Sequence, residues 1–242
     1  MIPRMRVFAG PNGSGKSTLA QWLSRDYAVN LYRYINADVL FAEINATRKT
    51  ACPFTMETTQ LLSFVQKTTY PDAQKNYFLD GKIRVEDESV CFEQEAINSY
   101  TVALLADYYR HECLSRGDSF SFETVFSHPS KIDILKEARL KGYRTYLYFV
   151  STENPEINID RIAIRVLEGG HDVPADKIIE RYHRCLDNVA PALPFLNRAY
   201  FFDNTKTDIR FIAEADEGKW KFYTTALPEW FTKAVLGDIS LN

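Results

Sequence analysis

The stretch GPNGSGKS, residues 10–17, decides the fold of this 242-residue chain. It matches the phosphate-loop pattern GxxxxGK[ST] and lies between an apolar strand predicted over residues 6–9 and a helix predicted over residues 16–25. Its glycines allow backbone N–H groups to point at phosphates, and the start of the helix adds partial positive charge. Lys16 would reach the β- and γ-phosphates, and the Ser17 hydroxyl would ligate Mg²⁺. We therefore predict that ATP with Mg²⁺ binds at Gly10, Pro11, Asn12, Gly13, Ser14, Gly15, Lys16, Ser17 and Thr18.

Two other classes of phosphate-loop protein are excluded by the rest of the sequence. An ABC-type ATPase carries an LSGGQ-like signature downstream, and a GTPase carries an NKxD-like motif that reads the base. Neither motif occurs in this chain. Nucleotide kinases and small-molecule kinases remain, so we predict an enzyme that transfers the γ-phosphoryl group of ATP to a small acceptor.

The composition indicates a folded protein that does not depend on nucleic acid. Hydrophobic residues make up 45% of the chain and aromatic residues 14%, which is enough for a sizeable core. The net charge of -3 argues against a nucleic-acid binder with a strongly basic surface, although a local basic groove stays open. We expect a small-molecule partner and no nucleic acid.

The cysteines and the apolar runs indicate a cytoplasmic protein. The four cysteines form neither a CxxC pair nor a zinc-ligand spacing, which fits reduced thiols. No apolar run reaches the roughly 18 residues of a transmembrane helix. The opening MIPRMRVFAG leads directly into the first strand, so we expect neither a signal peptide nor membrane association.

Strands alternate with helices outward from the phosphate loop, which predicts an α/β fold. Four further strands are expected at residues 34–38, 118–125, 143–151 and 198–204. With the first strand they would form the five-stranded parallel sheet of a P-loop NTPase, in the order 2-3-1-4-5, with helices on both faces. We interpret residues 1–242 as a single P-loop kinase domain with a helical lid at 155–190 and a C-terminal hairpin plus helix at 206–242.

Residues 45–95 interrupt this alternation with polar, turn-rich sequence. Within them, Asp80-Gly81 lies between apolar flanks in residues 77–85, a pattern typical of a β-hairpin. A long helix over residues 93–115 then brings the chain back. Because the phosphate loop and the lid are accounted for elsewhere, we expect the insertion to form part of the acceptor pocket.

Two carboxylates are expected at strand ends, where ligands of open α/β sheets bind. Glu123 would hold the water shell of Mg²⁺ or the acceptor, with Thr124 as a neighbouring substrate contact. Asp38 would face the acceptor hydroxyl as general base or orienting group. Asp38 could instead cap a helix that begins there.

Arginines in the lid are expected to neutralise the charge of the transferring group. Arg161 and Arg165 are four residues apart and share one helix face. On the next helix a second basic stripe comprises Lys177, Arg181 and Arg184. The alternative is a solvated basic face balanced by Glu168, Asp176 and Glu180.

Four motifs together resemble the zeta toxin family of P-loop kinases, especially its shorter bacterial members. They are GPNGSGKST at 10–18, INAD at 35–38, SFET at 121–124 and RIAIRVLEGGHDVP at 161–174. The resemblance covers most of residues 5–205 except the insertion. It implies a nucleoside-monophosphate-kinase-like fold and ATP-dependent phosphorylation of a sugar hydroxyl on UDP-N-acetylglucosamine.

The resemblance also implies roles for individual residues. Lys16 and Ser17 would hold the nucleotide and the metal, Asp38 would be the base, and Glu123 would contact the sugar. The lid arginines would neutralise the phosphates, and an antitoxin would be the protein partner.

Two alternatives stay open. The chain could be a kinase for another metabolite or for a nucleic-acid end, or an ATP-binding regulatory module that transfers no phosphate. Turnover with UDP-sugars, turnover with another acceptor, or tight binding without transfer separates the three hypotheses.

Overall fold

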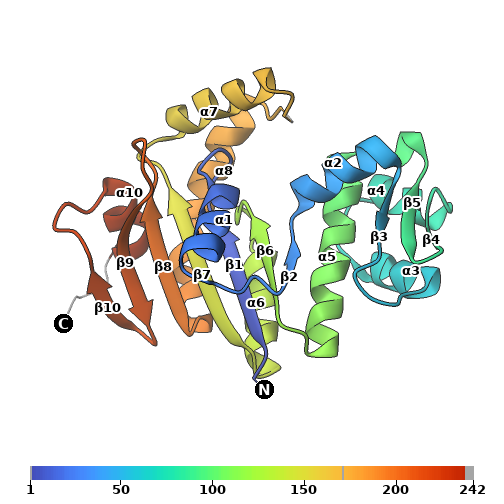
Figure 1. Ribbon diagram of the computed structural model, residues 1–242, viewed down its shortest axis with the longest axis horizontal. Coiled ribbons are helices and arrows are strands. Elements are labelled where there is room, and N and C mark those ends of the chain that lie inside the picture. Colours follow the sequence, from blue (N-terminus) through green and yellow to red (C-terminus); the bar gives the residue numbers. More distant parts are fainter. Residues whose placement is uncertain (1, 171, 238–242) are drawn as a thin grey trace. The chain divides into compact units, whose positions relative to one another are not determined.

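A computed structural model describes residues 2–170 and 172–237 of the chain (Figure 1). The chain forms two compact units. The first unit combines Met1–Tyr32 with Ser121–Asn242, and the second unit is the continuous stretch Arg33–Phe120. The second unit is longer than the segment 45–95 that the sequence distinguishes. His171, in the GGHDVP motif, lies outside the described residues.

The sheet of the first unit runs in the order β10-β9-β8-β7-β1-β6. β7 pairs in parallel with both β1 and β8, whereas β9 and β10 continue the sheet in antiparallel pairing as the predicted tail hairpin. The strands are β1 (Arg4–Ala9), β6 (Phe120–Thr124), β7 (Arg144–Ser151), β8 (Arg198–Asp203), β9 (Arg210–Asp216) and β10 (Lys219–Phe222). A mostly parallel sheet with helices confirms the predicted α/β class.

The centre of this sheet is apolar because it is covered on both faces. Every residue of β7 after Arg144 is buried, as its continuous apolar sequence predicts. Phe8, Tyr148 and Tyr200 are direct neighbours across three strands, and their rings stack with centroids 4.8 Å and 5.0 Å apart. The stack helps to fix the register of β1, which leads into the phosphate loop, against β7 and β8.

The predicted lid is a pair of helices with a small core of its own. Asn154 caps the first helix by accepting from the Ile157 N–H, and proline occupies its first position. The two helices pack through Ile162, Val173 and Ile178.

None of the helices over residues 2–170 and 172–237 combines the length and hydropathy of a membrane span. The first unit contains α1 (Lys16–Asp26), α6 (Ser130–Leu140), α7 (Pro155–Leu167), α8 (Ala175–Asp187), α9 (Val189–Ala192), α10 (Glu229–Phe231), a 3-10 turn (Leu193–Phe195) and a π-helical turn (Thr232–Leu236).

The second unit packs helices against a three-stranded antiparallel sheet in the order β3-β5-β4. Buried residues such as Leu61, Phe78, Val90 and Leu105 give it its own core. Its elements are β2 (Arg33–Ile35), α2 (Ala37–Thr47), β3 (Lys49–Ala51), α3 (Thr58–Lys67), α4 (Asp72–Leu79), β4 (Ile83–Glu86), β5 (Ser89–Phe92), a 3-10 turn (Gln94–Ala96) and α5 (Ser99–Arg116).

The prediction that the second strand extends to Asp38 is wrong. β2 ends at Ile35, and Asn36 caps α2 by accepting from the N–H groups of Asp38 and Val39. Asp38 is therefore the second residue of a helix. An asparagine side chain that satisfies two helix N–H groups ends the strand earlier than the apolar pattern indicates.

The predicted hairpin at Asp80-Gly81 is also wrong. The Asp80 N–H donates to the carbonyl of Asn76, and Gly81 has a φ of +76°, so the pair ends α4. The hairpin of this segment lies farther along the chain, between β4 and β5, where Asp87 and Glu88 both adopt positive φ. An Asp-Gly pair suits a helix end as well as a hairpin turn, because both need a left-handed residue.

Candidate functional site

The phosphate loop closes around the side chain of its own lysine. Lys16 Nζ donates to the carbonyl oxygens of Gly10 (3.0 Å) and Pro11 (2.8 Å). Gly13 and Gly15 have φ of +74° and +92°, which glycine adopts without strain. Because the N-cap residue Gly15 has no side chain, the first N–H groups of α1 are left for a phosphate.

Gly10 is required by the contact between the loop and β7. A Cβ at this position would lie 2.0 Å from the carbonyl oxygen of Val150. We expect Gly10→Ala to lower the free energy of unfolding by about 3 kcal/mol or more, because two backbone segments would have to separate.

Gly142→Ala is a matched control within the same unit. Gly142 also has positive φ (+79°), but an added Cβ would meet no atom within 4 Å. Its expected loss is about 1 kcal/mol, from the backbone conformation alone. Urea denaturation measures both variants, and equal losses would contradict the tight contact at Gly10.

Ser17 and Glu123 come together beside the phosphate loop. Ser17 Oγ donates to Glu123 Oε2 at 2.9 Å, although the two residues are far apart in sequence. Glu123 is buried in the second-to-last position of β6, and Ser17 is the second residue of α1. A hydroxyl and a carboxylate are hard oxygen donors of the kind Mg²⁺ prefers, with water and phosphate as further ligands. The pair therefore fits the predicted metal site.

A strained turn fixes the end of β6. Phe126 is buried with a φ of +63°, a conformation that is costly for an aromatic residue. It is held by the N–H bond from Phe126 to Thr124 Oγ1 (3.1 Å) and by Asn188 Nδ2, which donates to Phe126 O (2.9 Å). The turn sets the direction of Glu123, and the Thr124 hydroxyl can still donate its proton to a ligand.

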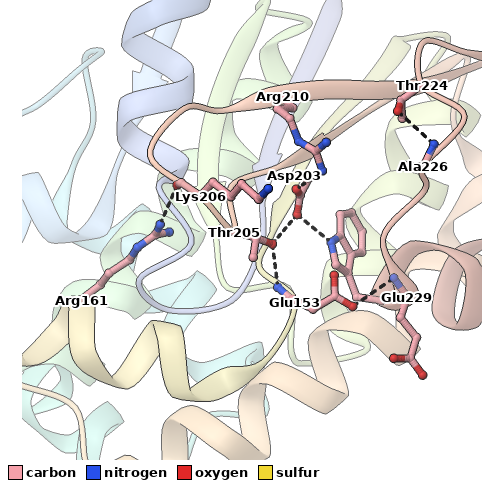
Figure 2. Close-up of polar contacts among 10 residues, drawn as sticks. Glu153, Arg161, Asp203, Thr205, Lys206, Arg210, Thr224, Ala226 and Glu229 are labelled. Carbon is pink, nitrogen blue, oxygen red and sulfur yellow. Dashed lines mark hydrogen bonds and ion pairs between the residues drawn. The ribbon is translucent and has the colours of Figure 1, made fainter.

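The first lid helix reaches both the phosphate loop and the segment after β8. Arg161 Nη2 donates to the carbonyl oxygen of Lys206 at 3.2 Å (Figure 2). Arg165 lies one helical turn farther along, where its carbonyl accepts from the Gly170 N–H at 2.8 Å. Asn158 of the same helix donates to the carbonyl of Asn12, so the helix that carries both arginines contacts the phosphate loop.

Two of the three residues of the basic stripe are paired within α8. Lys177 and Arg184 both contact Glu180, at 3.0 Å and 3.4 Å, on an exposed face. These contacts hold the pKa of the Glu180 carboxyl below its usual value. For Lys177 and Arg184 the arrangement matches the solvated basic face that the sequence offered as an alternative.

Asp38 lies in the second unit, whereas Lys16, Ser17, Glu123 and the lid arginines lie in the first. It is exposed in the first turn of α2, next to Asn36. A negative charge in the first turn also stabilises a helix electrostatically, so Asp38 has a structural role besides the predicted one.

Two residues that contact the phosphate loop were not predicted from the sequence. Asn158 of α7 and Asn204, directly after β8, donate from their side-chain amides to loop carbonyls. No local signal identifies them, because Asn158 lies in an ordinary amphipathic helix and Asn204 at the end of a strand.

The segment after β8 is anchored by a buried carboxylate (Figure 2). Asp203 is buried and accepts three hydrogen bonds, from Thr205 Oγ1 (2.5 Å), Arg210 Nη2 (2.7 Å) and Trp230 Nε1 (3.3 Å). The Glu153 N–H in turn donates to Thr205 Oγ1 at 3.0 Å. The chain on both sides of Asn204 is therefore fixed.

Comparison with protein families and curated proteins gives one partial match. No family model matches the chain. An uncharacterized protein of Haemophilus influenzae is 32% identical over 72 residues, which is 30% of this chain and 51% of that protein. The match thus spans about half the length of this relative.

Solved structures share the fold over the whole chain. A chain of the AvrRxo1-ORF1:AvrRxo1-ORF2 complex with ATP superposes with a TM-score of 0.57 at 15% identity, covering 100% of this chain and 66% of that one. A chain from the PezAT toxin–antitoxin system of Streptococcus pneumoniae gives 0.53 at 14% identity, with coverages of 99% and 81%. These neighbours are P-loop kinases of the zeta toxin family, so the resemblance read from the motifs is confirmed at the level of the fold.

Proposed function

We propose that the chain is a cytoplasmic ATP-dependent phosphotransferase that moves the γ-phosphoryl group to a hydroxyl of a small acceptor. The observation that carries the proposal is the 2.9 Å contact between Ser17 and Glu123 beside a complete phosphate loop. The resemblance of the motifs at 35–38, 121–124 and 161–174 to the zeta toxin family favours a nucleotide sugar such as UDP-N-acetylglucosamine as acceptor.

The residues divide the work of phosphoryl transfer between them. Loop N–H groups and Lys16 bind the β- and γ-phosphates, Ser17 ligates Mg²⁺, and Glu123 contacts its water shell or the acceptor. When bound, Mg²⁺ neutralises charge on the phosphates. A lid arginine meets the transferring group, and Asp38 accepts the proton of the attacking hydroxyl. The second unit, which contains the insertion 45–95, is the proposed source of the acceptor pocket.

The test is an acceptor screen with the purified chain, ATP and Mg²⁺. UDP-N-acetylglucosamine, other nucleotide sugars, free sugars and nucleic-acid ends are offered, and mass spectrometry reports which gains a phosphoryl group. Phosphorylation of the UDP-sugar supports the proposal, and another product corrects the acceptor. Tight ATP binding with no product in any reaction would favour a regulatory module instead.

A protein partner is part of the proposal. The PezAT neighbour belongs to a toxin–antitoxin system, and AvrRxo1-ORF1 was solved together with AvrRxo1-ORF2. We infer that this chain is controlled by an antitoxin. Co-expression of a genomic neighbour that relieves growth arrest caused by the chain would support this inference.

Asp38→Asn is expected to lower turnover about 10²-fold or more with little change in ATP affinity, because a general base acts only in transfer. Asp72→Asn is the matched control, since Asp72 is also an exposed first-turn acid of a helix in the second unit. Steady-state kinetics and ATP titration measure both variants. Weaker ATP binding with normal turnover at saturation would instead make Asp38 a nucleotide or metal residue.

A further inference from the structure

Two buried asparagines bind outward-facing carbonyl groups of the phosphate loop. Asn158 is fully buried in the first half of α7, and its Nδ2 donates to the carbonyl oxygen of Asn12. Asn204 is buried directly after β8, and its Nδ2 donates to the carbonyl oxygen of Ser14 at 2.8 Å. The two contacts come from separate elements and reach alternate residues of one loop.

Both asparagines pack directly against glycines of the loop. A Cβ added to Gly13 would lie 2.8 Å from the backbone oxygen of Asn158. A Cβ added to Gly15 would lie 2.6 Å from Nδ2 of Asn204. These positions therefore need glycine because the asparagines approach so closely, in addition to the positive φ.

A further contact fixes the side-chain amide of Asn158 and the backbone of Asn204. Asn158 Oδ1 accepts from the hydroxyl of buried Thr152, so its nitrogen faces the loop. The carbonyl of Thr152 accepts from the hydroxyl of Tyr182 at 2.6 Å, and burial raises the pKa of Tyr182, which keeps its proton. The Asn204 N–H donates to Ser151 O at 2.8 Å, next to the Asp203 contacts of Figure 2.

Peptide geometry links these contacts to phosphate binding. In a trans peptide the C=O and the following N–H point in opposite directions, and no peptide bond within the described ranges is cis. When Asn158 holds the carbonyl of Asn12 on its own side, the Gly13 N–H must point away from Asn158. Asn204 directs the Gly15 N–H in the same way. Successive N–H groups that converge in this manner form an anion-binding nest.

We propose that Asn158 and Asn204 are positioning residues that aim the N–H groups of Gly13 and Gly15 at the phosphates. The proposal rests on the proposed function only in requiring that the loop binds phosphate. It makes each asparagine responsible for one identified amide, which a general stabilising role would not do.

The glycine amides give a residue-level test by NMR. The chain has ten glycines, so a sample labelled with ¹⁵N at glycine alone gives a simple amide spectrum. Pyrophosphate, which has neither base nor acceptor, is titrated into the wild-type chain, and the Gly13 and Gly15 amide signals are expected to shift. Asn158→Ala should remove the Gly13 shift and keep the Gly15 shift, and Asn204→Ala should do the reverse. Pyrophosphate affinity should fall about tenfold in each variant, as for one lost hydrogen bond.

Two other asparagines serve as matched controls. Asn154 caps α7, and buried Asn197, directly before β8, accepts from Arg139 and from the N–H of Thr145 in β7. Asn154→Ala and Asn197→Ala should lower the melting temperature yet leave pyrophosphate affinity within about twofold. If an alanine variant of Asn158 or Asn204 does not fold, the aspartate variant keeps the side-chain volume and removes the donor, and the same crossed pattern is expected.

The outcomes separate this inference from the proposed function. Equal shifts of both glycines in every variant, or an equal affinity loss in the controls, would overturn the positioning role. A wild-type loop that takes up no pyrophosphate would remove both ideas. A loop that binds pyrophosphate in a chain that phosphorylates no acceptor would leave the positioning role standing and reject only the transferase.

Discussion

Lys16→Ala is expected to abolish phosphoryl transfer, with a fall of about 10³-fold or more, while the fold stays intact. The ammonium group is the cation of the loop, and its loss leaves the charge that develops on the β- and γ-phosphates without that stabilisation. The same side chain ties Gly10 and Pro11 together through two hydrogen bonds. Losing those bonds should lower the free energy of unfolding by only about 1–2 kcal/mol.

γ-Phosphate transfer and thermal melting are measured together on this variant. Lys136→Ala is the matched control, because Lys136 is an exposed lysine of α6 that contacts Asp133 and lies outside the loop. It should turn over at the wild-type rate. Retained turnover in Lys16→Ala would reject the kinase proposal as a whole.

Single alanine substitutions at the lid arginines 161, 165, 181 and 184 are expected to differ sharply in their effect on turnover. At least one of the two arginines of α7 should cost about 10³-fold in turnover, because a guanidinium at the transferring group has an effect of that size. α7 contacts the phosphate loop through Asn158, and Arg161 donates to Lys206 O, two residues after the loop contact Asn204. The first pair is therefore close to where a triphosphate would bind.

Arg184 provides the internal control for this series. Its guanidinium contacts Glu180 on the exposed face of α8, and surface pairs of this kind contribute little to stability. Arg184→Ala should therefore keep near wild-type turnover and a nearly unchanged free energy of unfolding. Arginine-to-lysine variants at 161 and 165 then show whether charge alone suffices or the planar fork is needed. If all four alanine variants turn over at the wild-type rate, the catalytic role of the lid arginines is rejected and they form only a solvated, charged surface.

The sequence predicts those features that depend on local order. The phosphate loop is one such feature, because its glycines, lysine and serine are adjacent in the chain. The end of β2 could not be placed, since Asn36 as a cap competes with the strand pattern up to Asp38. Asp80-Gly81 was misinterpreted for a similar reason, because one dipeptide fits two left-handed turns.

Contacts over long sequence separations are what the sequence could not predict. Asn158 meets Asn12 across 146 positions, and Asn204 meets Ser14 across 190. An amide that holds a distant carbonyl leaves no pattern near itself, unlike a cap or a turn. The contact of Ser17 with Glu123 spans 106 positions but joins two residues that were both predicted for the site, since loop and strand-end positions carry a recognisable chemistry.

The division of the first unit into two chain segments has a consequence for synthesis on the ribosome. β1, which leads into the phosphate loop, pairs with β7, and Arg4 lies opposite Arg144. The second unit is one continuous stretch that ends at Phe120, so its contacts are complete within one segment of chain, whereas β1 waits for its distant partner β7. Nascent chains therefore carry the loop sequence long before they carry the site. A product that stops short of β7 would lack Val150, which packs against Gly10, and the asparagines in α7 and directly after β8 that contact the loop, so the loop sequence would be present without its supports.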